Sequence, residues 1–169
     1  MAKTTPCGRF LDNFGSIVDV NSESGLPVTI VNFTDWQIWH ESDLTANDND
    51  KTITVPAGYE WQVLWVYVEY TSDANAGNRQ LELRILDAGG NTIGQVRPGT
   101  TQAASLTRNY MFAPSLADLV GFRDTDYLMT PFPPTVFLPA GYSIQMLDNN
   151  NVSAADDFNF HIHLARREL

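Results

Sequence analysis

The sequence predicts an all-β protein: a single jelly-roll-like antiparallel β-sandwich over residues 28–169, preceded by an extended N-terminal arm over residues 1–27. Three observations predict this fold class. Short segments of alternating apolar and polar residues recur, separated by turn-forming Gly, Pro, Asn and Asp. No segment carries a helical stripe of more than two turns. Aromatic residues, which favour pleated sheets, are abundant, with four Trp, six Tyr and nine Phe among 169 residues.

The arm is predicted from its composition. Residues 1–27 are rich in Gly, Ser, Asn and Asp, and their isolated apolar residues, Phe10 and Phe14 among them, show no sustained periodicity. A terminal segment of this kind becomes ordered when it docks on a partner. We therefore expect Phe10 and Phe14 to contribute to an interface.

The strands follow from β-branched runs and from period-two alternation. They are expected at residues 28–33, 36–40, 61–70, 81–85, 92–96, 106–112, 136–138, 143–147 and 158–164. Residues 87–91, Asp-Ala-Gly-Gly-Asn, predict a hairpin turn. Residues 41–50 and the Pro-rich segment around residues 131–134 are expected to be loops, and residues 115–120 are the one plausible short helix.

The segment 61–70 is apolar on both of its expected faces. Alternation places Trp61, Val63, Trp65 and Tyr67 on one face and Leu64, Val66, Val68 and Tyr70 on the other. A two-layer sandwich covers one face of each sheet, so the second face requires an arm, a loop or another subunit. A central strand beneath a long loop is the alternative.

A ten-residue pattern occurs twice, at residues 55–64 and 138–147, with six identical positions that include Pro-Ala-Gly-Tyr. In each copy Pro favours a turn, Gly can take a positive φ, and an alternating segment begins at Tyr. The pattern predicts two related corners of one sandwich.

Charge and composition exclude several classes of function. The formal net charge of −10 disfavours nucleic acid as a partner. Cys7 is the single cysteine, which excludes an intrachain disulfide framework and a cysteine-built zinc site. The N-terminal residues resemble no signal peptide, and no run approaches the roughly 18 apolar residues that span a bilayer. We expect a soluble protein made in the cytoplasm, with no membrane partner.

Candidate chemistry is sparse. His161, His163 and Glu168 match half of a cupin metal motif, but no later histidine follows, which favours two outward-facing histidines on the last strand. Acidic clusters at residues 47–50, 124–126 and 156–157 leave a bound cation open, although none has the spacing of a calcium loop. No nucleophile with a neighbouring base and no phosphate-binding glycine loop is present. We expect no enzyme activity, no cofactor and no metal.

Three segments resemble a known family: residues 77–85 (GNRQLELRI), 102–114 (QAASLTRNYMFAP) and 138–157 (LPAGYSIQMLDNNNVSAADD). Together they are similar to small virion proteins of tailed bacteriophages, which are regarded as head decoration or cement proteins with β-sandwich folds. The resemblance implies a structural virion protein on the capsid surface, with no catalytic residues to transfer. Relatives tend to have Arg where this chain has Gln145.

The resemblance and the patterns lead to one hypothesis and one alternative. The hypothesis is a capsid decoration protein, made in the host cytoplasm, that binds the major capsid protein outside the phage head and forms a homo-oligomer, by lattice symmetry a trimer. The alternative is a receptor- or glycan-binding β-sandwich of a head or tail fibre, because aromatic side chains can stack on sugars. The residues expected at an interface are Phe10, Phe14, Trp36, Trp39, Trp61, Trp65 and Tyr67.

Overall fold

The computed structural model describes residues 9–11, 17–19, 36–45, 50–119, 121–122, 126–149 and 153–169. The chain divides into two units, Met1–Thr34 and Asp35–Leu169. In the first unit, β1 (Arg9–Leu11) pairs with β2 (Ile17–Asp19) in antiparallel register, a short hairpin that the irregular sequence did not predict. The strand expected at residues 28–33 and the predicted boundary after residue 27 lie outside the described residues.

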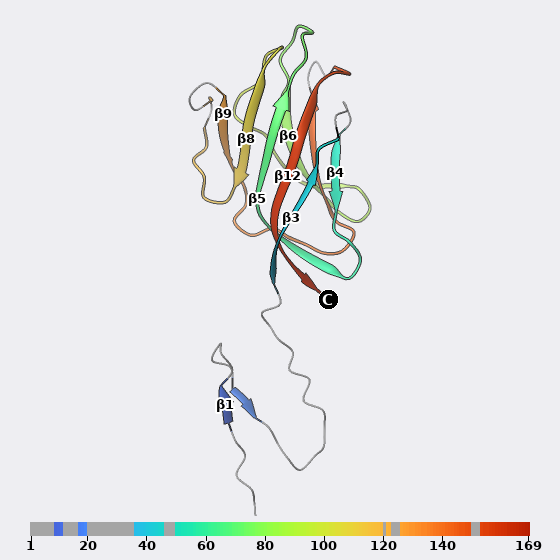
Figure 1. Ribbon diagram of the computed structural model, residues 1–169, viewed down its shortest axis with the longest axis vertical. Coiled ribbons are helices and arrows are strands. Elements are labelled where there is room, and N and C mark those ends of the chain that lie inside the picture. Colours follow the sequence, from blue (N-terminus) through green and yellow to red (C-terminus); the bar gives the residue numbers. More distant parts are fainter. Residues whose placement is uncertain are drawn as a thin grey trace, which may run out of the picture. The chain divides into compact units, whose positions relative to one another are not determined.

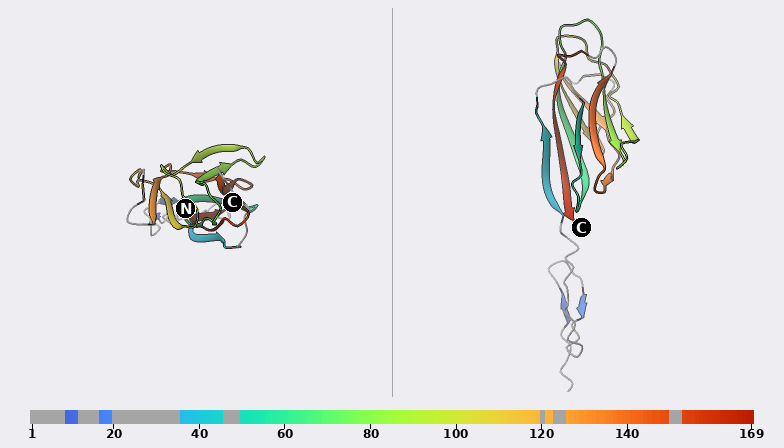
Figure 2. Two further views of the ribbon diagram at one scale, coloured as in Figure 1. Left: turned by 90° about the horizontal axis from the view of Figure 1, so that it is seen from above. Right: turned by 90° about the vertical axis from the view of Figure 1, so that its right-hand side faces the viewer.

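The second unit is a sandwich of two β-sheets (Figures 1 and 2). The six-stranded sheet contains β3 (Gln37–Asp43), β12 (Asp157–Glu168), β5 (Tyr59–Thr71), β8 (Thr107–Ala113) and β9 (Tyr127–Pro131) in that order, with β10 (Phe137–Leu138) also paired to β5. The four-stranded sheet has the order β4 (Lys51–Thr54), β11 (Ser143–Asn149), β6 (Gln80–Leu86) and β7 (Thr92–Val96). The predicted all-β class is confirmed.

The pairing of the strands is nested in the manner of a jelly roll. The first strand of the sandwich, β3, pairs with the last, β12; β4 pairs with β11, β5 with β8, and β6 with β7. The chain is thus one long antiparallel hairpin wound over on itself, and the winding brings β12 beside β5 and β11 beside β6. Two packed sheets result from a single continuous ribbon.

Several local predictions were wrong. Residues 41–43, predicted as loop, continue β3, and β4 was not predicted. No strand was predicted between residues 112 and 136, but residues 127–131 form β9, which pairs with β8 in parallel at the edge of the sheet. Pro131 is tolerated there because some residues of an edge strand need no N–H for pairing. No helix occurs in the part of the chain that the structure describes, including residues 115–119. Ser115 has a φ of 62°, a left-handed conformation that cannot begin a right-handed helix.

A β-bulge explains why residues 61–70 are apolar on both sides. His163 of β12 lies opposite Trp65, whereas the next residue, Leu164, lies opposite Val63, so Leu64 is an extra residue in β5. The bulge reverses the alternation. Core residues are therefore Trp61 and Val63 before it, and Val66, Val68 and Tyr70 after it.

The two Pro-Ala-Gly-Tyr segments form the predicted turns. Tyr59 N–H donates to the carbonyl of Pro56 at 3.3 Å, and Tyr142 N–H donates to that of Pro139 at 3.1 Å. Gly58 and Gly141 have φ values of 82° and 84°. The turns are also neighbours: β4 leads into the first and the second leads into β11, and these strands are paired.

Substituting alanine at either glycine should destabilise the fold. A positive φ costs an L-residue roughly 1–2 kcal/mol. Gly141→Ala should cost more than Gly58→Ala, because a Cβ at position 141 would lie 3.2 Å from the Cβ of Ala88, whereas one at position 58 meets nothing within 4 Å. Urea unfolding measures both. Gly121→Ala is the control and should be nearly neutral, since that position is open and its φ is not positive; equal costs at all three glycines would contradict the turn geometry.

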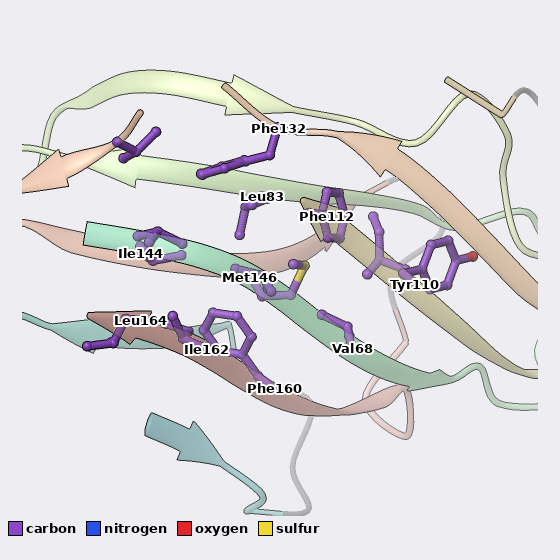
Figure 3. Packing of buried hydrophobic residues seen from close by; sticks show 14 of the residues in the cluster. Val68, Leu83, Tyr110, Phe112, Phe132, Ile144, Met146, Phe160, Ile162 and Leu164 are labelled. Carbon is purple, nitrogen blue, oxygen red and sulfur yellow. The ribbon is translucent and has the colours of Figure 1, made fainter. Parts of the chain in front are cut away.

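The core fills the space between the sheets (Figure 3). Phe160, Ile162 and Leu164 project from β12, and Ile144 and Met146 project from β11 of the opposite sheet. Since alternate residues of each strand enter this layer, the intervening residues of β12 and β5 face outward.

The loops at one end of the sandwich are joined by a buried arginine. Arg79, which is fully buried, donates from Nε to Asp156 at 2.9 Å and from a terminal nitrogen to the carbonyls of Asn75 and Gly77 at 2.8 and 2.9 Å. Its other terminal nitrogen binds the carboxylate of Asp73. We call this group the Arg79 clasp.

Candidate interaction surface

The outward side of the six-stranded sheet, here the outer face, is organised in rows that cross the strands. Residues directly opposite in neighbouring strands share a face, so the register defines each row. Starting from the C-terminal end of β12, the rows are Trp36, Arg167 and Glu60; Ile38, Ala165, Gln62 and Phe137; His40, His163 and Trp65; Ser42, His161, Tyr67, Met111 and Met129; and Asn159, Glu69, Asn109 and Tyr127.

The first two rows expose apolar surface. Ile38 is 63% exposed and Phe137 is 48% exposed, and both are large apolar side chains. The ring of Trp36 lies 5.9 Å from that of Phe137, and the guanidinium of Arg167 lies over Trp36 at 5.0 Å. Arg167 also donates from Nε to Glu60 at 2.7 Å, which orients it. An apolar patch bordered by an ion pair is typical of a protein interface.

The next two rows combine histidines with aromatic rings. His163 stacks on Trp65 with ring centroids 4.8 Å apart and an interplanar angle of 20°. His161 lies 5.8 Å from Tyr67, whose hydroxyl donates to Asn109 at 2.6 Å. These contacts half-bury the aromatic rings, so this part of the outer face is ordered by its own side chains.

Two imidazoles meet across β3 and β12. His40 Nε2 and His161 Nδ1 are 3.2 Å apart, and the rings are stacked at 5.4 Å. One nitrogen must donate and the other accept, so the contact requires at least one neutral ring. Burial lowers the pKa of His161, His40 lowers it further, and Glu69 acts in the opposite direction.

This pair predicts a loss of stability in mild acid. The pKa of His161 in the folded protein lies below its ordinary value of 6.5, so the unfolded chain binds the proton more readily. Stability should therefore fall as the pH decreases from above 6.5 through the folded pKa. Unfolding free energies at pH 7.5 and 5.0 should differ less in His161→Gln than in the wild type. An equal pH dependence in both proteins would contradict this role, and Gln145→Glu on the other sheet controls for a simple change of charge.

The structure places the predicted interface residues in three environments. Trp36, Trp65 and Tyr67 lie on the outer face, and Trp39 lies on the opposite side of the edge strand β3, where it is 40% exposed. Trp61 is 1% exposed and belongs to the core, because it precedes the bulge; it offers no surface to a partner.

The two remaining predicted residues belong to the first unit. Phe10 lies in β1, and Phe14 lies outside the described residues. Sequence reasoning missed Ile38, His40 and Phe137. Their row positions depend on long-range register, although the alternation of His161 and His163 with the core residues already indicated the outward direction of β12.

The candidate metal and cation residues have other arrangements. Within the described ranges, no group of three or more His, Cys, Asp or Glu side chains is arranged to hold a metal ion. His161 contacts His40, and Asp156 binds Arg79. In the same ranges no helix is long and apolar enough to cross a membrane.

Comparisons with known proteins give likeness in structure alone. No protein-family model matches the chain. No curated protein matches it either. Similar solved structures come from infectious bursal disease virus. A chain of the T13 viral particle has a TM-score of 0.32 and 9% sequence identity, and the match covers 94% of this chain and 34% of the viral chain. A chain of the VP2 subviral particle has a TM-score of 0.27 and 7% identity, with 94% and 36% covered, and a chain of the Gx strain has a TM-score of 0.29 and 6% identity, with 78% and 30% covered.

The similarity to these viral chains is partial and weak. The chain spans about a third of the length of the viral chains that it matches. With TM-scores between 0.27 and 0.32 and identities below 10%, the likeness assigns no function to this chain.

Proposed function

We propose that this chain is a structural virion protein, a decoration protein that binds the outside of a phage head and stabilises contacts between capsomers. The observation that carries the proposal is the apolar row of the outer face, whose two ends are the exposed side chains of Ile38 and Phe137. The resemblance of residues 77–85, 102–114 and 138–157 to phage head decoration proteins supports the same function. The proposed partners are the major capsid protein and further copies of this chain, arranged as a trimer.

The apolar row has the chemistry that protein interfaces use. Burying apolar surface contributes about 25 cal/mol per Å², and exposed aromatic side chains are frequent anchors of interfaces. Row neighbours are held by pairing across β3, β12, β5 and β10, so little conformational entropy is lost when a partner covers them. A rigid apolar face suits permanent assembly better than turnover of a substrate, and we propose no enzyme activity.

Binding to shells assembled without this chain tests the proposal. The wild type should co-sediment with such shells, and the double variant Ile38→Ser, Phe137→Ser should bind at least about 30-fold more weakly, the effect of losing roughly 2 kcal/mol at an interface hot spot. Light scattering should show that the free protein self-associates. Ile93→Ser is the matched control: Ile93 is 57% exposed but lies on β7 of the other sheet.

Two results would overturn the proposal. One is a monomeric protein that fails to bind shells. The other is full binding by the double variant together with loss of binding by Ile93→Ser, which would move the interface to the other sheet. Glycan binding that is abolished by Trp39→Ala would favour the receptor-binding alternative instead.

A further inference from the structure

A pocket lies at the end of the six-stranded sheet, beside the C-terminal end of β12. Its volume is about 350 Å³, and it is lined by Gln37, Tyr59, Arg166, Arg167 and Glu168. The register brings these residues together, because Arg166 lies opposite Gln37 of β3 and Glu168 lies opposite Tyr59 of β5. Three strands that are distant in sequence therefore build one site.

The guanidinium of Arg166 is held in place by aromatic rings. It lies 3.4 Å from the ring centroid of Trp39 and 5.2 Å from that of Tyr59. Trp39 is itself oriented, since its indole nitrogen donates to Glu41 at 2.8 Å. Stacking fixes the plane of the guanidinium and leaves its edge, where all its hydrogen-bond donors lie, for an acceptor.

Arg166 lacks an anionic partner within the described part of the chain. It forms no ion pair there, and its Nε atom is buried without a hydrogen-bond acceptor. The neighbouring Arg167 differs, because its guanidinium is neutralised by Glu60. The pocket thus contains a guanidinium whose Nε lacks an acceptor, in a protein whose net charge is −10.

We propose that this pocket binds a single carboxylate on the edge of Arg166. The planar fork of a guanidinium matches two carboxylate oxygens, and the amide of Gln37 and the hydroxyl of Tyr59 are further donors in the wall. Glu168 in the wall and the acidic surface disfavour a doubly charged phosphate. The carboxylate can belong to an acidic side chain of another protein or to a small molecule. The inference does not depend on the virion role.

Titration of the ¹⁵N-labelled full-length protein followed by NMR tests the site. Acetate replaces chloride at constant ionic strength, and the Trp39 indole and the Gln37 and Tyr59 amide signals should shift saturably, with a dissociation constant of about 1 mM or weaker. Arg166→Met should abolish the shifts, and Arg166→Lys should weaken binding several-fold, because an ammonium lacks the fork. Arg97→Lys, on the other sheet, is the matched control and should bind like the wild type.

Two further ligands distinguish the origin of the bound carboxylate and test whether the proposal is wrong. An amide-capped Gly-Glu-Gly peptide that binds more tightly than acetate indicates a protein side chain, whereas acetate binding with no peptide binding indicates a small carboxylate. Shifts that do not saturate, or that persist in a folded Arg166→Met variant, would overturn the proposal. Tighter binding of inorganic phosphate than of acetate would overturn its choice of ligand; this comparison uses the wild type and so does not depend on whether a variant folds.

Discussion

Replacing Arg79 with methionine should lower the free energy of unfolding by about 3–5 kcal/mol at pH 7, the cost of leaving a buried carboxylate, that of Asp156, without its cation. Arg79 is fully buried, and so is Asp156, which it binds at 2.9 Å. The substitution also leaves the carbonyls of Asn75 and Gly77 without a donor. Because the clasp ties the 72–79 loop to the start of β12, we expect the whole loop end of the sandwich to loosen. Urea unfolding followed by tryptophan fluorescence measures the loss.

The loss of unfolding free energy in Arg79→Met should depend on pH. Burial, the largest influence, acts to raise the pKa of Asp156, but the hydrogen bond and charge of Arg79 together with hydrogen bonds from the backbone N–H groups of Asp73 and Ser153 outweigh it, and the pKa lies below its ordinary value of 3.8. A lowered carboxyl pKa contributes stability above that ordinary value and loses it as the pH falls through the folded pKa. The difference between wild type and Arg79→Met should therefore shrink as the pH is lowered from 7 towards 3.

Arg97→Met is the matched control for Arg79→Met. Arg97 also binds a buried carboxylate, that of Glu82, at 2.5 Å, but it is half exposed. Glu82 would keep Arg84 at 2.5 Å and the amide of Asn149 at 3.1 Å. We expect a cost of about 1 kcal/mol, typical of one hydrogen bond. Equal losses of unfolding free energy in the two variants would show that the Arg79 clasp stabilises the fold no more than an exposed ion pair does.

Phe160→Ala should cost about 3–5 kcal/mol, the usual effect of truncating a fully buried phenylalanine. Phe160 lies in the layer between the sheets and has no exposed surface (Figure 3). β12 is central in its sheet, and the surrounding strands restrict how far a cavity can collapse. Thermal and urea unfolding report the loss directly.

Asn159→Ala is the control for Phe160→Ala, since it changes the adjacent residue on the other side of β12. Asn159 faces outward and donates to Glu69 at 3.1 Å, so its removal should cost less than about 1.5 kcal/mol. The comparison tests the register of β12: a strand displaced by one residue would exchange the two sides, and Asn159→Ala would then be the costly variant.

The six-stranded sheet separates the two surfaces that we propose for binding. Its outer face offers an apolar row and a histidine–aromatic cluster, while the opposite side of its β3 end holds the stacked guanidinium of Arg166. β3 contributes to both, with Ile38 and His40 on one side and Trp39 on the other. Variants of β3 should therefore be interpreted one residue at a time.

The sequence alone determined the features that local chemistry controls. Alternation predicted most strands, the Gly-rich residues 87–91 predicted a turn that Asp87 closes by accepting hydrogen bonds from the N–H groups of Gly89 and Asn91, and the two Pro-Ala-Gly-Tyr segments predicted turns with a positive φ. Each of these depends on a few neighbouring residues, so its signal is present in a short window of sequence.

Tertiary structure decided whatever depends on which strands pair. The bulge at Leu64 is visible only against β12, and it moves Trp61 into the core while leaving Trp65 on the outer face. The meeting of His40 with His161 and the stacking of Trp39 on Arg166 each join residues more than a hundred positions apart. The alternation of residues predicts that a strand has two different faces. Pairing with a distant strand decides which face is buried, because only the assembled sheets remove one side from water.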